Sequence, residues 1–152
     1  MAAGQELLAL GQWLIALLTS DAAFAAVCGA RVYEGAAPEK DPATSLSPAY
    51  PLCVFNVQHA RDTKAMGGKT VLTAVDLLVQ VIGTGGYGQI QPADRRLQAL
   101  LDAPRVDAIT VDGDDYYMLG CTRTAPIQRP EFNNGVRYSY MGGIWRVDLQ
   151  SV

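Results

Sequence analysis

Hydrophobic and polar positions along the chain predict nine elements, in the order helix, helix, strand, strand, strand, helix, strand, strand, strand. In residues 5–19, leucines recur at steps of three and four, the spacing of one buried helical face. Ser20 and Asp21 follow, and their side-chain oxygens can cap a second, alanine-rich helix over residues 22–28. Gly29 is a natural end for that helix, because glycine tolerates positive φ.

The first three predicted strands surround two very different connections. Residues 31–34 are a short strand candidate, and residues 35–51 are a long surface loop, because four prolines forbid a regular ladder or helix there. Residues 52–58 predict the second strand. Residues 70–82 predict a third with apolar side chains on both faces, which favours a central strand covered on both sides, or covered on one side by a neighbouring subunit. Between them, residues 60–69 form a polar, glycine-containing hairpin arm.

A glycine-rich break over residues 83–88 separates the third strand from the third helix. Pro92 fits the first turn of that helix, which runs to about Asp102. Its inward side chains are expected to be Leu97, Leu100 and Leu101.

The last part of the chain predicts three more strands, over residues 106–111, 116–127 and 136–149. Turns are expected at residues 112–114 and 130–135. Gly142 and Gly143 interrupt the alternation of the final strand, which predicts a bulge or sharp bend. The pattern as a whole predicts one α+β domain over residues 1–152, a mostly antiparallel sheet with two N-terminal helices and one central helix packed on one face.

Composition narrows the function. Hydrophobic residues make up 49% and charged residues 18% of the chain, which suits either a surface partly covered by partners or a simply alanine-rich protein. The formal charge of −3 does not indicate the basic surface that a protein needs to bind nucleic acid, although DNA could pass through a channel without binding. The first helix lacks a basic residue before it and is too short to span a bilayer, so no membrane partner is expected. The cysteines are odd in number and widely spaced, which predicts buried free thiols in a reducing cytoplasm; they are Cys28, Cys53 and Cys121.

The motifs that could carry chemistry are incomplete. The stretch from Met66 to Thr70 resembles the end of a phosphate-binding loop, but it lacks the required upstream glycine and precedes a strand, so a hairpin turn is favoured. Residues 83–88 begin like a dinucleotide motif but break its spacing, which favours a hinge. His59 is the one histidine, and a hydrolase would have to use it; we expect it to face solvent or an interface. We therefore predict a protein that is not an enzyme, with no cofactor and no metal.

Two other groups of side chains have structural interpretations as well. Asp112, Asp114 and Asp115 could bind calcium, but no downstream glutamate completes a calcium loop, so a solvated turn is favoured. The strand aromatics could stack on single-stranded nucleic acid, but the negative charge favours core or interface positions. These aromatics are Tyr116, Tyr117, Tyr138, Tyr140 and Trp145.

The order and spacing of several segments resemble the tail-completion, or tail terminator, proteins of long-tailed bacteriophages and related prophages. An Ala/Leu-rich helix and a capped second helix lead into Arg31-Val32-Tyr33 and a proline-rich loop. Pro51-Leu52-Cys53-Val54-Phe55 resembles the family's step from proline to an apolar strand. A long strand with Asp76, and then Arg96-Leu97-Gln98-Ala99-Leu100-Leu101-Asp102, resemble its middle. The segment from Gly135 to Val147, GVRYSYMGGIWRV, resembles its closing strand and is the most specific.

The resemblance implies a fold similar to tail terminator and tail-tube subunits, and a hexameric ring at the head-proximal end of the tail tube. Such a ring ends tube polymerisation and joins the tail to the head-side connector, with DNA passing through the central channel. The implied partners are other copies of the chain, the major tail (tube) protein, the head-side connector or stopper, and the end of the tape-measure protein. The implied location is the virion, after assembly in the host cytoplasm.

A ring that stops polymerisation must present two different faces, and loops on a rigid sheet are the natural place for them. We expect the arm over residues 60–69 to project and to become ordered on docking, and strands of adjacent subunits to form a continuous inner wall that hides sheet edges. The arm's partner-contacting residues are predicted to be Arg61, Asp62, Thr63, Lys64, Met66 and Lys69. Those of the other loops are predicted to be Asp112, Asp114, Asp115, Glu131, Asn133 and Asn134. The alternatives are a monomeric α+β ligand-binding domain, another neck or connector adaptor, and a small hydrolase using His59.

Overall fold

A computed structural model describes residues 5–40, 49–68, 70–102, 107–111 and 114–151. The helices are α1 (Gln5–Ser20), α2 (Ala22–Cys28) and α3 (Tyr87–Leu101). The strands are β1 (Val32–Glu34), β2 (Leu52–Lys64), β3 (Thr70–Gly83), β4 (Asp107–Val111), β5 (Asp114–Asn133) and β6 (Val136–Ser151). The element order predicted from the sequence is confirmed.

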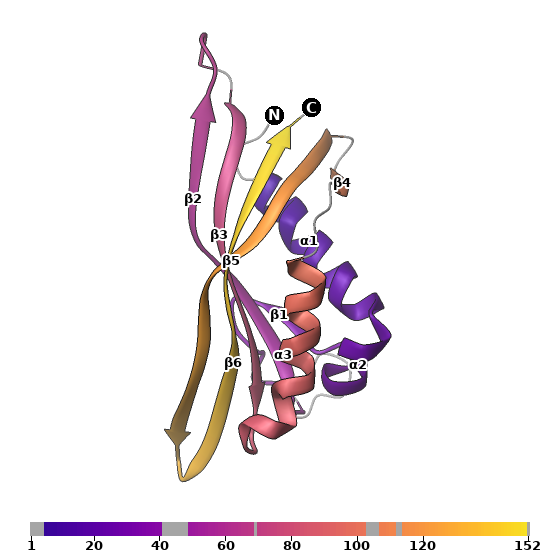
Figure 1. The fold of residues 1–152 in the computed structure, drawn as a ribbon, viewed down its shortest axis with the longest axis vertical. Coiled ribbons are helices and arrows are strands. Elements are labelled where there is room, and N and C mark those ends of the chain that lie inside the picture. Colours follow the sequence, from indigo (N-terminus) through magenta and orange to yellow (C-terminus); the bar gives the residue numbers. More distant parts are fainter. Residues whose placement is uncertain (1–4, 41–48, 69, 103–106, 112–113, 152) are drawn as a thin grey trace.

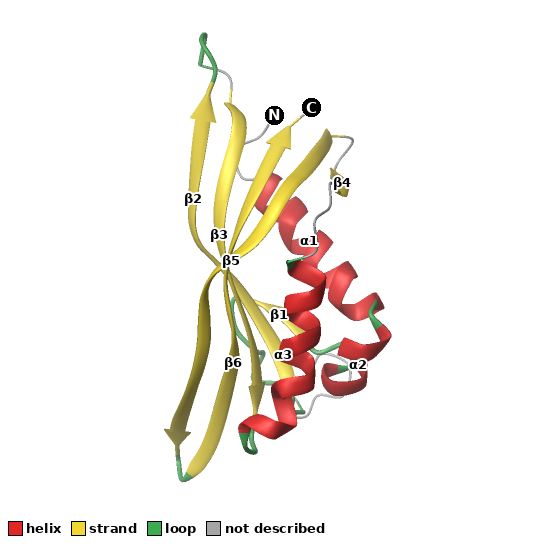
Figure 2. Cartoon of the chain, viewed as in Figure 1, coloured by secondary structure: helices red, strands yellow, loops and turns green. Residues whose placement is uncertain are grey.

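The strands form a single six-stranded sheet in the order β1-β2-β3-β6-β5-β4. β1 pairs with β2 in parallel, and every other pairing is antiparallel. All three helices lie on one face of this sheet, as Figures 1 and 2 show, so the predicted α+β architecture is confirmed. β3 is an inner strand between β2 and β6, also as predicted. Among the described residues, the helices cover only one of its faces, and we call the face without helices the open face.

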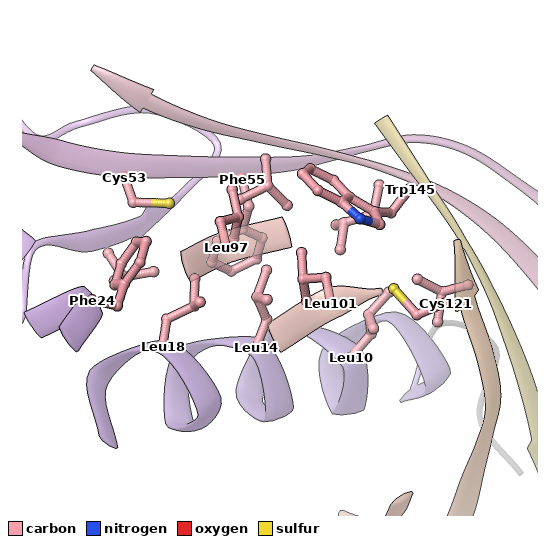
Figure 3. Close-up of a cluster of buried hydrophobic side chains, with 14 of the residues drawn as sticks. Leu10, Leu14, Leu18, Phe24, Cys53, Phe55, Leu97, Leu101, Cys121 and Trp145 are labelled. Carbon is pink, nitrogen blue, oxygen red and sulfur yellow. The ribbon is translucent and has the colours of Figure 1, made fainter. Parts of the chain in front are cut away.

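The core lies between the helices and the covered face (Figure 3). Every fourth position of α1 points into it, and Phe24 of α2 and Leu97 of α3 close it from the sides. Trp145 of β6 is its largest fully buried side chain. Burial of each large side chain contributes about 1.5–3 kcal/mol to folding. The α1 side chains in the core are Leu10, Leu14 and Leu18.

The three cysteines are buried thiols outside any disulfide, as the sequence predicts. Burial raises the pKa of Cys28 to about 11 and the pKa of Cys53 well above its usual value. A thiol with such a pKa is almost entirely protonated at neutral pH, and the thiolate is the nucleophilic form. Cys28 and Cys53 therefore pack as small apolar side chains.

Two side-chain contacts fix the helices to their surroundings. Asp21 caps α2 by accepting a hydrogen bond from the Phe24 amide at 2.9 Å, as predicted. The same carboxylate receives the Arg96 guanidinium of α3, at 2.7 Å from Nη2 and 2.9 Å from Nε. At the other end of α3, Asp102 accepts a hydrogen bond from the Trp145 indole at 2.9 Å. The N-terminal helices, α3 and the sheet are thus joined by charged hydrogen bonds as well as by the core.

The start of α3 differs from the prediction. The helix begins at Tyr87, so Pro92 lies inside it and not in its first turn. The missing Pro92 amide would have bonded to the carbonyl of Gly88, which is exposed. Gly86 at the N-cap has no side chain to cap with, and the Gln89 side chain accepts the Gly85 amide instead, at 3.1 Å. Leu97 and Leu101 are buried as predicted, and Leu100 is partly buried at the edge of the core.

The strands of both hairpins are longer than the sequence predicts. β2 continues to Lys64, so the first half of the arm predicted over residues 60–69 is paired strand, and its turn spans residues 65–68. β5 continues to Asn133, so the turn predicted over residues 130–135 is wrong except for Asn134 and Gly135. These two residues have φ values of 49° and 77°, the conformation of a two-residue hairpin turn that an Asn-Gly pair favours.

Gly142 and Gly143 do not form the bulge that was predicted. β6 pairs with β3 without interruption through both glycines. The register shifts lie in the β2–β3 pairing near Gln58 and between Thr63 and Lys64, and in β5 near Leu119 and Thr124. The glycines are required because the neighbouring backbones are close. A Cβ on Gly142 would collide with the Val79 carbonyl oxygen.

The two hairpins give the molecule its elongated shape (Figure 1). The β2–β3 hairpin extends past the helices at the end where both chain termini lie, and the β5–β6 hairpin extends past them at the opposite end. Among the described residues, no single helix is long and apolar enough to cross a bilayer. α1 and α2 together reach that length and apolarity, but a 90° bend separates them.

Gly142→Ala should lower the free energy of unfolding by about 1–3 kcal/mol, because the added methyl group has no space between the two strands. Gly120→Ala in β5 is the matched control, since nothing lies within 4 Å of its added Cβ, and it should change stability by less than about 0.5 kcal/mol. Urea unfolding followed by tryptophan fluorescence measures both. Equal stability of the two variants would contradict the close approach at Gly142.

Substitutions at Asp21 should separate its cap from its ion pair. Asparagine caps helices as well as aspartate does, so Asp21→Asn should lose only the attraction to Arg96. Asp21→Ala should also lose the cap and be less stable by a further ~0.5–2 kcal/mol. The hydrogen bond from Arg96 lowers the pKa of Asp21 below 3.8. The advantage of the wild type over Asp21→Asn should therefore be complete above about pH 4 and should vanish as the pH falls through that lowered pKa. Urea midpoints measured from pH 7 to pH 2 test this, and a constant difference across the range would contradict it.

Candidate assembly interface

The predicted arm residues lie together at one end of the molecule. Arg61, Thr63 and Lys64 are exposed on β2, and Asp62 accepts a hydrogen bond from the Thr73 hydroxyl of β3 at 2.8 Å. Met66 lies at the tip of the hairpin and is fully exposed. Lys69 lies outside the described residues. This end is thus a basic ribbon with an apolar side chain at its tip.

The predicted acidic loop lies near the same end of the sheet, where β4 meets β5 (Figure 1). Asp115 is exposed and accepts a hydrogen bond from the Thr110 hydroxyl at 2.6 Å. Asp114 is the first residue of β5, so the predicted turn ends before it, and Asp112 lies outside the described residues. Within the described chain, no three His, Cys, Asp or Glu residues are grouped as metal ligands would be.

The remaining predicted contact residues belong to the hairpin at the opposite end. Glu131 and Asn133 are exposed near the end of β5, and Asn134 is in the turn. Phe132 lies between them with its side chain 70% exposed, and the sequence pattern did not predict it as a contact residue. The Asn134-Gly135 pair was the signal that could have located this hairpin and therefore Phe132. The structure thus divides the predicted interface into two groups at opposite ends.

The open face between the two ends has a charged part and an apolar part. Across three neighbouring strands, His59 of β2 and Arg146 of β6 both lie opposite Asp76 of β3. Arg146 also contacts Asp148, with its Nε 3.6 Å from a carboxylate oxygen. Towards the β5–β6 hairpin the half-buried apolar side chains begin. These include Val54, Leu78, Ile82 and Ile144.

A groove of about 370 Å³ lies in this apolar part. Leu52, Val54 and Ile82 form its aliphatic lining, and Glu131 stands among its polar residues. Its tyrosines come from the loop before β2 and from β6, and the rings of Tyr50 and Tyr138 lie 5.6 Å apart. The tyrosines lining the groove are Tyr50, Tyr138 and Tyr140. Such a surface suits an apolar side chain with a positively charged neighbour.

Tyr140 is the most perturbed group in the groove. Burial, followed by its hydrogen bond to Glu131, raises its pKa to about 12. The Arg129 guanidinium lies 4.1 Å from the centre of the same ring and 3.5 Å from a Glu131 carboxylate oxygen. The phenol is therefore neutral and held between a cation and an acid. The other strand aromatics were predicted at core or interface positions. Tyr116 and Trp145 are buried in the core, whereas Tyr117 is partly exposed.

The two stretches that resemble nucleotide-binding motifs connect other elements, and a hinge at residues 83–88 stays a prediction. Met66 and Gly67 form a hairpin turn, and a strand follows, so no helix N-terminus is available for a phosphate. His59 is exposed on β2. Residues 84–86 connect β3 to α3, and the Ser139 hydroxyl donates to the Gly85 carbonyl at 2.7 Å.

Comparison with known proteins places the fold. No protein-family model matches the chain, and no curated protein sequence matches it. Among solved structures, the chain is similar to a chain of the "Virion of native gene transfer agent (GTA) particle", with a TM-score of 0.70 and 18% sequence identity. The match covers 95% of this chain and 97% of that chain. At this identity the two chains share their fold.

The state of Tyr140 gives a test of the groove. Because its pKa is raised above the ordinary value of 10, the folded protein should lose stability as the pH rises from about 10 to about 12. Glu131→Gln should lower the pKa of Tyr140, since it removes a carboxylate that disfavours the phenolate. Spectrophotometric titration of the wild type, of Glu131→Gln and of Tyr140→Phe checks this. A Tyr140 that titrates near 10 in the folded wild type would contradict the contact.

Proposed function

We propose that this chain is a structural subunit of a phage-like virion, and that it acts as a tail terminator. The observation that carries the proposal is the fold shared over nearly the whole chain with a chain of a gene transfer agent virion. The resemblance of the sequence to tail-completion proteins supports the same role. In this role the protein needs no cofactor and no catalytic turnover.

The distribution of exposed apolar side chains fits a subunit with two different docking faces. Met66 and Phe132 are exposed at hairpin tips on opposite ends of the molecule. The Met66 tip is flanked by the basic β2 strand, and the Phe132 tip by Glu131 and the tyrosine groove. Two chemically different ends let a ring bind the last tube ring on one side and a different partner on the other. A tube subunit, by contrast, must match itself from ring to ring.

In the proposed assembly, copies of the chain form a hexameric ring that ends tail-tube polymerisation. The helices lie outside, and the charged part of the open face lines the central channel through which DNA passes. One hairpin tip docks on the major tail (tube) protein, and the other on the head-side connector. The ring is assembled in the host cytoplasm and remains at the neck of the virion.

The tyrosine groove supports a second candidate, a monomeric ligand-binding domain or another neck adaptor. A pocket of about 370 Å³ is within the range of small-ligand sites. Analytical ultracentrifugation and negative-stain imaging separate the two classes. A ring that caps purified tail tubes supports the terminator, whereas a strict monomer without affinity for tubes would overturn it.

Met66→Asp and Phe132→Asp should each abolish one docking event and leave the ring intact, because each places a charge at a single apolar tip. Leu119→Asp is the control, since Leu119 is also a large exposed apolar side chain, at 42% exposure, but lies at neither tip. Co-sedimentation with tail tubes and with filled heads measures docking, and light scattering measures the ring. If neither tip variant affects either docking event, the assignment of the two faces is wrong.

A further inference from the structure

The edge strands of the sheet cover only parts of their neighbours. β1 pairs with Cys53, Val54 and Phe55 of β2, and the rest of β2 has no outer partner among the described strands. At the other side of the sheet, β4 pairs with residues 114–118 of β5 and leaves the remainder of β5 at the edge. Residues 56–64 of β2 therefore have no outer strand among those described, and we call them the free stretch of β2. Residues 119–133 of β5 have no outer strand among those described either, although the Arg123 amide donates to the Asp102 carboxylate at 3.2 Å.

Residues 119–133 of β5 cannot pair regularly with a further strand because of their prolines. Asn133 and Val136 close a two-residue hairpin, so this pair exchanges the ladder hydrogen bonds, and residues at alternate positions before Asn133 also face β6. Pro126 and Pro130 occupy the positions between these residues, so their nitrogens point away from β6 and towards the outer edge. A proline nitrogen has no hydrogen to donate, so this edge cannot offer a regular ladder to another strand.

The free stretch of β2 is open. The Cys53 amide donates to the Arg31 carbonyl at 2.8 Å, and the Phe55 carbonyl accepts the Gly35 amide at 2.9 Å, so these alternate residues face outward. Beyond the bulge near Gln58, Ala60 lies in the outward-facing half of the alternation. β2 contains no proline, so its outward amides can all donate.

A second copy of this chain offers a matching edge in β4, which ends the other side of the sheet. β4 and the free stretch of β2 lie at the same end of the molecule (Figure 1). Four successive antiparallel pairings separate the two strands, so β4 runs in the same direction as β2. Rotation around a ring axis preserves direction, and the two strands would therefore meet in parallel, as β1 and β2 already do.

The charges of the two edges are complementary. The free stretch of β2 carries His59, Arg61 and Lys64 against one acid, Asp62. β4 and the first two residues of β5 contain acids and no basic residue. These acids are Asp107, Asp114 and Asp115. Opposite charges across the junction favour this pairing over a two-fold pairing of β2 with β2, which would bring like charges together.

We propose that residues 56–64 of β2 pair in parallel with β4 of the next copy in the ring, and that this main-chain junction joins neighbouring subunits at the β2–β3 end only. The inference rests on the proposed ring and names the strands that close it. At the opposite end, the prolines of β5 keep neighbouring sheets apart, so the β5–β6 hairpins remain separate and free to dock.

Cross-linking tests the junction in the full chain. Thr63 and Ala108 are exposed on the open face, and Thr63→Cys with Ala108→Cys should give covalent multimers up to the full ring when treated with a short bis-maleimide. The native cysteines are 8% exposed or less and should not react. Each single variant should remain monomeric on a denaturing gel. Thr63→Cys with Gln128→Cys, which places the second thiol on the proline-bearing edge, is the matched control and should give no ladder.

A ring that persists by light scattering without forming the ladder would overturn the junction and leave the proposed function standing. A monomer at all concentrations would overturn both. Dimers from Thr63→Cys alone would show β2 paired with β2 and would also overturn the junction.

Proline substitution tests the main-chain hydrogen bonds themselves. Ala60→Pro removes an outward amide from β2, and Gln128→Pro removes one from the closed edge of β5. We expect Ala60→Pro to raise the concentration needed for assembly about tenfold or more, while Gln128→Pro leaves it unchanged. Circular dichroism of the monomers confirms that each variant is folded. Equal effects of the two folded variants would overturn the proposal.

Discussion

The fold depends on the apolar layer between three helices and one face of a six-stranded sheet. Leu14 of α1 and Leu97 of α3 contribute to this layer from the helical side, and Phe55 and Trp145 contribute from the sheet. Among the described residues, the large buried side chains belong to the helices, to the covered face of the sheet or to the groove. The open face can therefore carry charges such as Asp76 and half-buried apolar groups without weakening the core. One covered face and one open face are what a subunit needs if it is rigid alone and completed by partners.

The two projecting hairpins are stable for a different reason. They extend beyond the helices, so strand pairing and cross-strand contacts hold them, together with the central sheet from which they grow. At the centre, the glycines of β6 let three backbones approach closely, which anchors both ribbons in one continuous ladder. The side chains at the tips consequently do not contribute to the core, so Met66 and Phe132 can be exposed without destabilising the fold.

Local patterns predicted the elements well because each had its own signal, such as the leucine spacing of α1 or the Asp21 cap of α2. The hairpin lengths could not be predicted in the same way. Polar stretches such as residues 60–64 look like loop, since their strand state comes from pairing with a distant neighbour. Pro130 looked like a turn residue, although an edge strand accepts proline wherever its nitrogen faces outward. The groove was also invisible, because its tyrosines come from segments nearly 90 residues apart in sequence, as Tyr50 and Tyr138 show.

The unequal edges of the sheet also affect the subunit while it is still free in solution. Pro126 and Pro130 have no amide hydrogen to donate, so at any ionic strength their edge cannot pair regularly with another strand. Pairing of the β2 edge with β2 of a second subunit is opposed mainly by electrostatic repulsion between residues such as Arg61 and Lys64. Salt shortens the range of that repulsion to about 8 Å at physiological ionic strength. Low ionic strength should therefore suppress the pairing of β2 with β2 most strongly, while it strengthens the attraction between the basic β2 edge and an acidic edge such as that of β4.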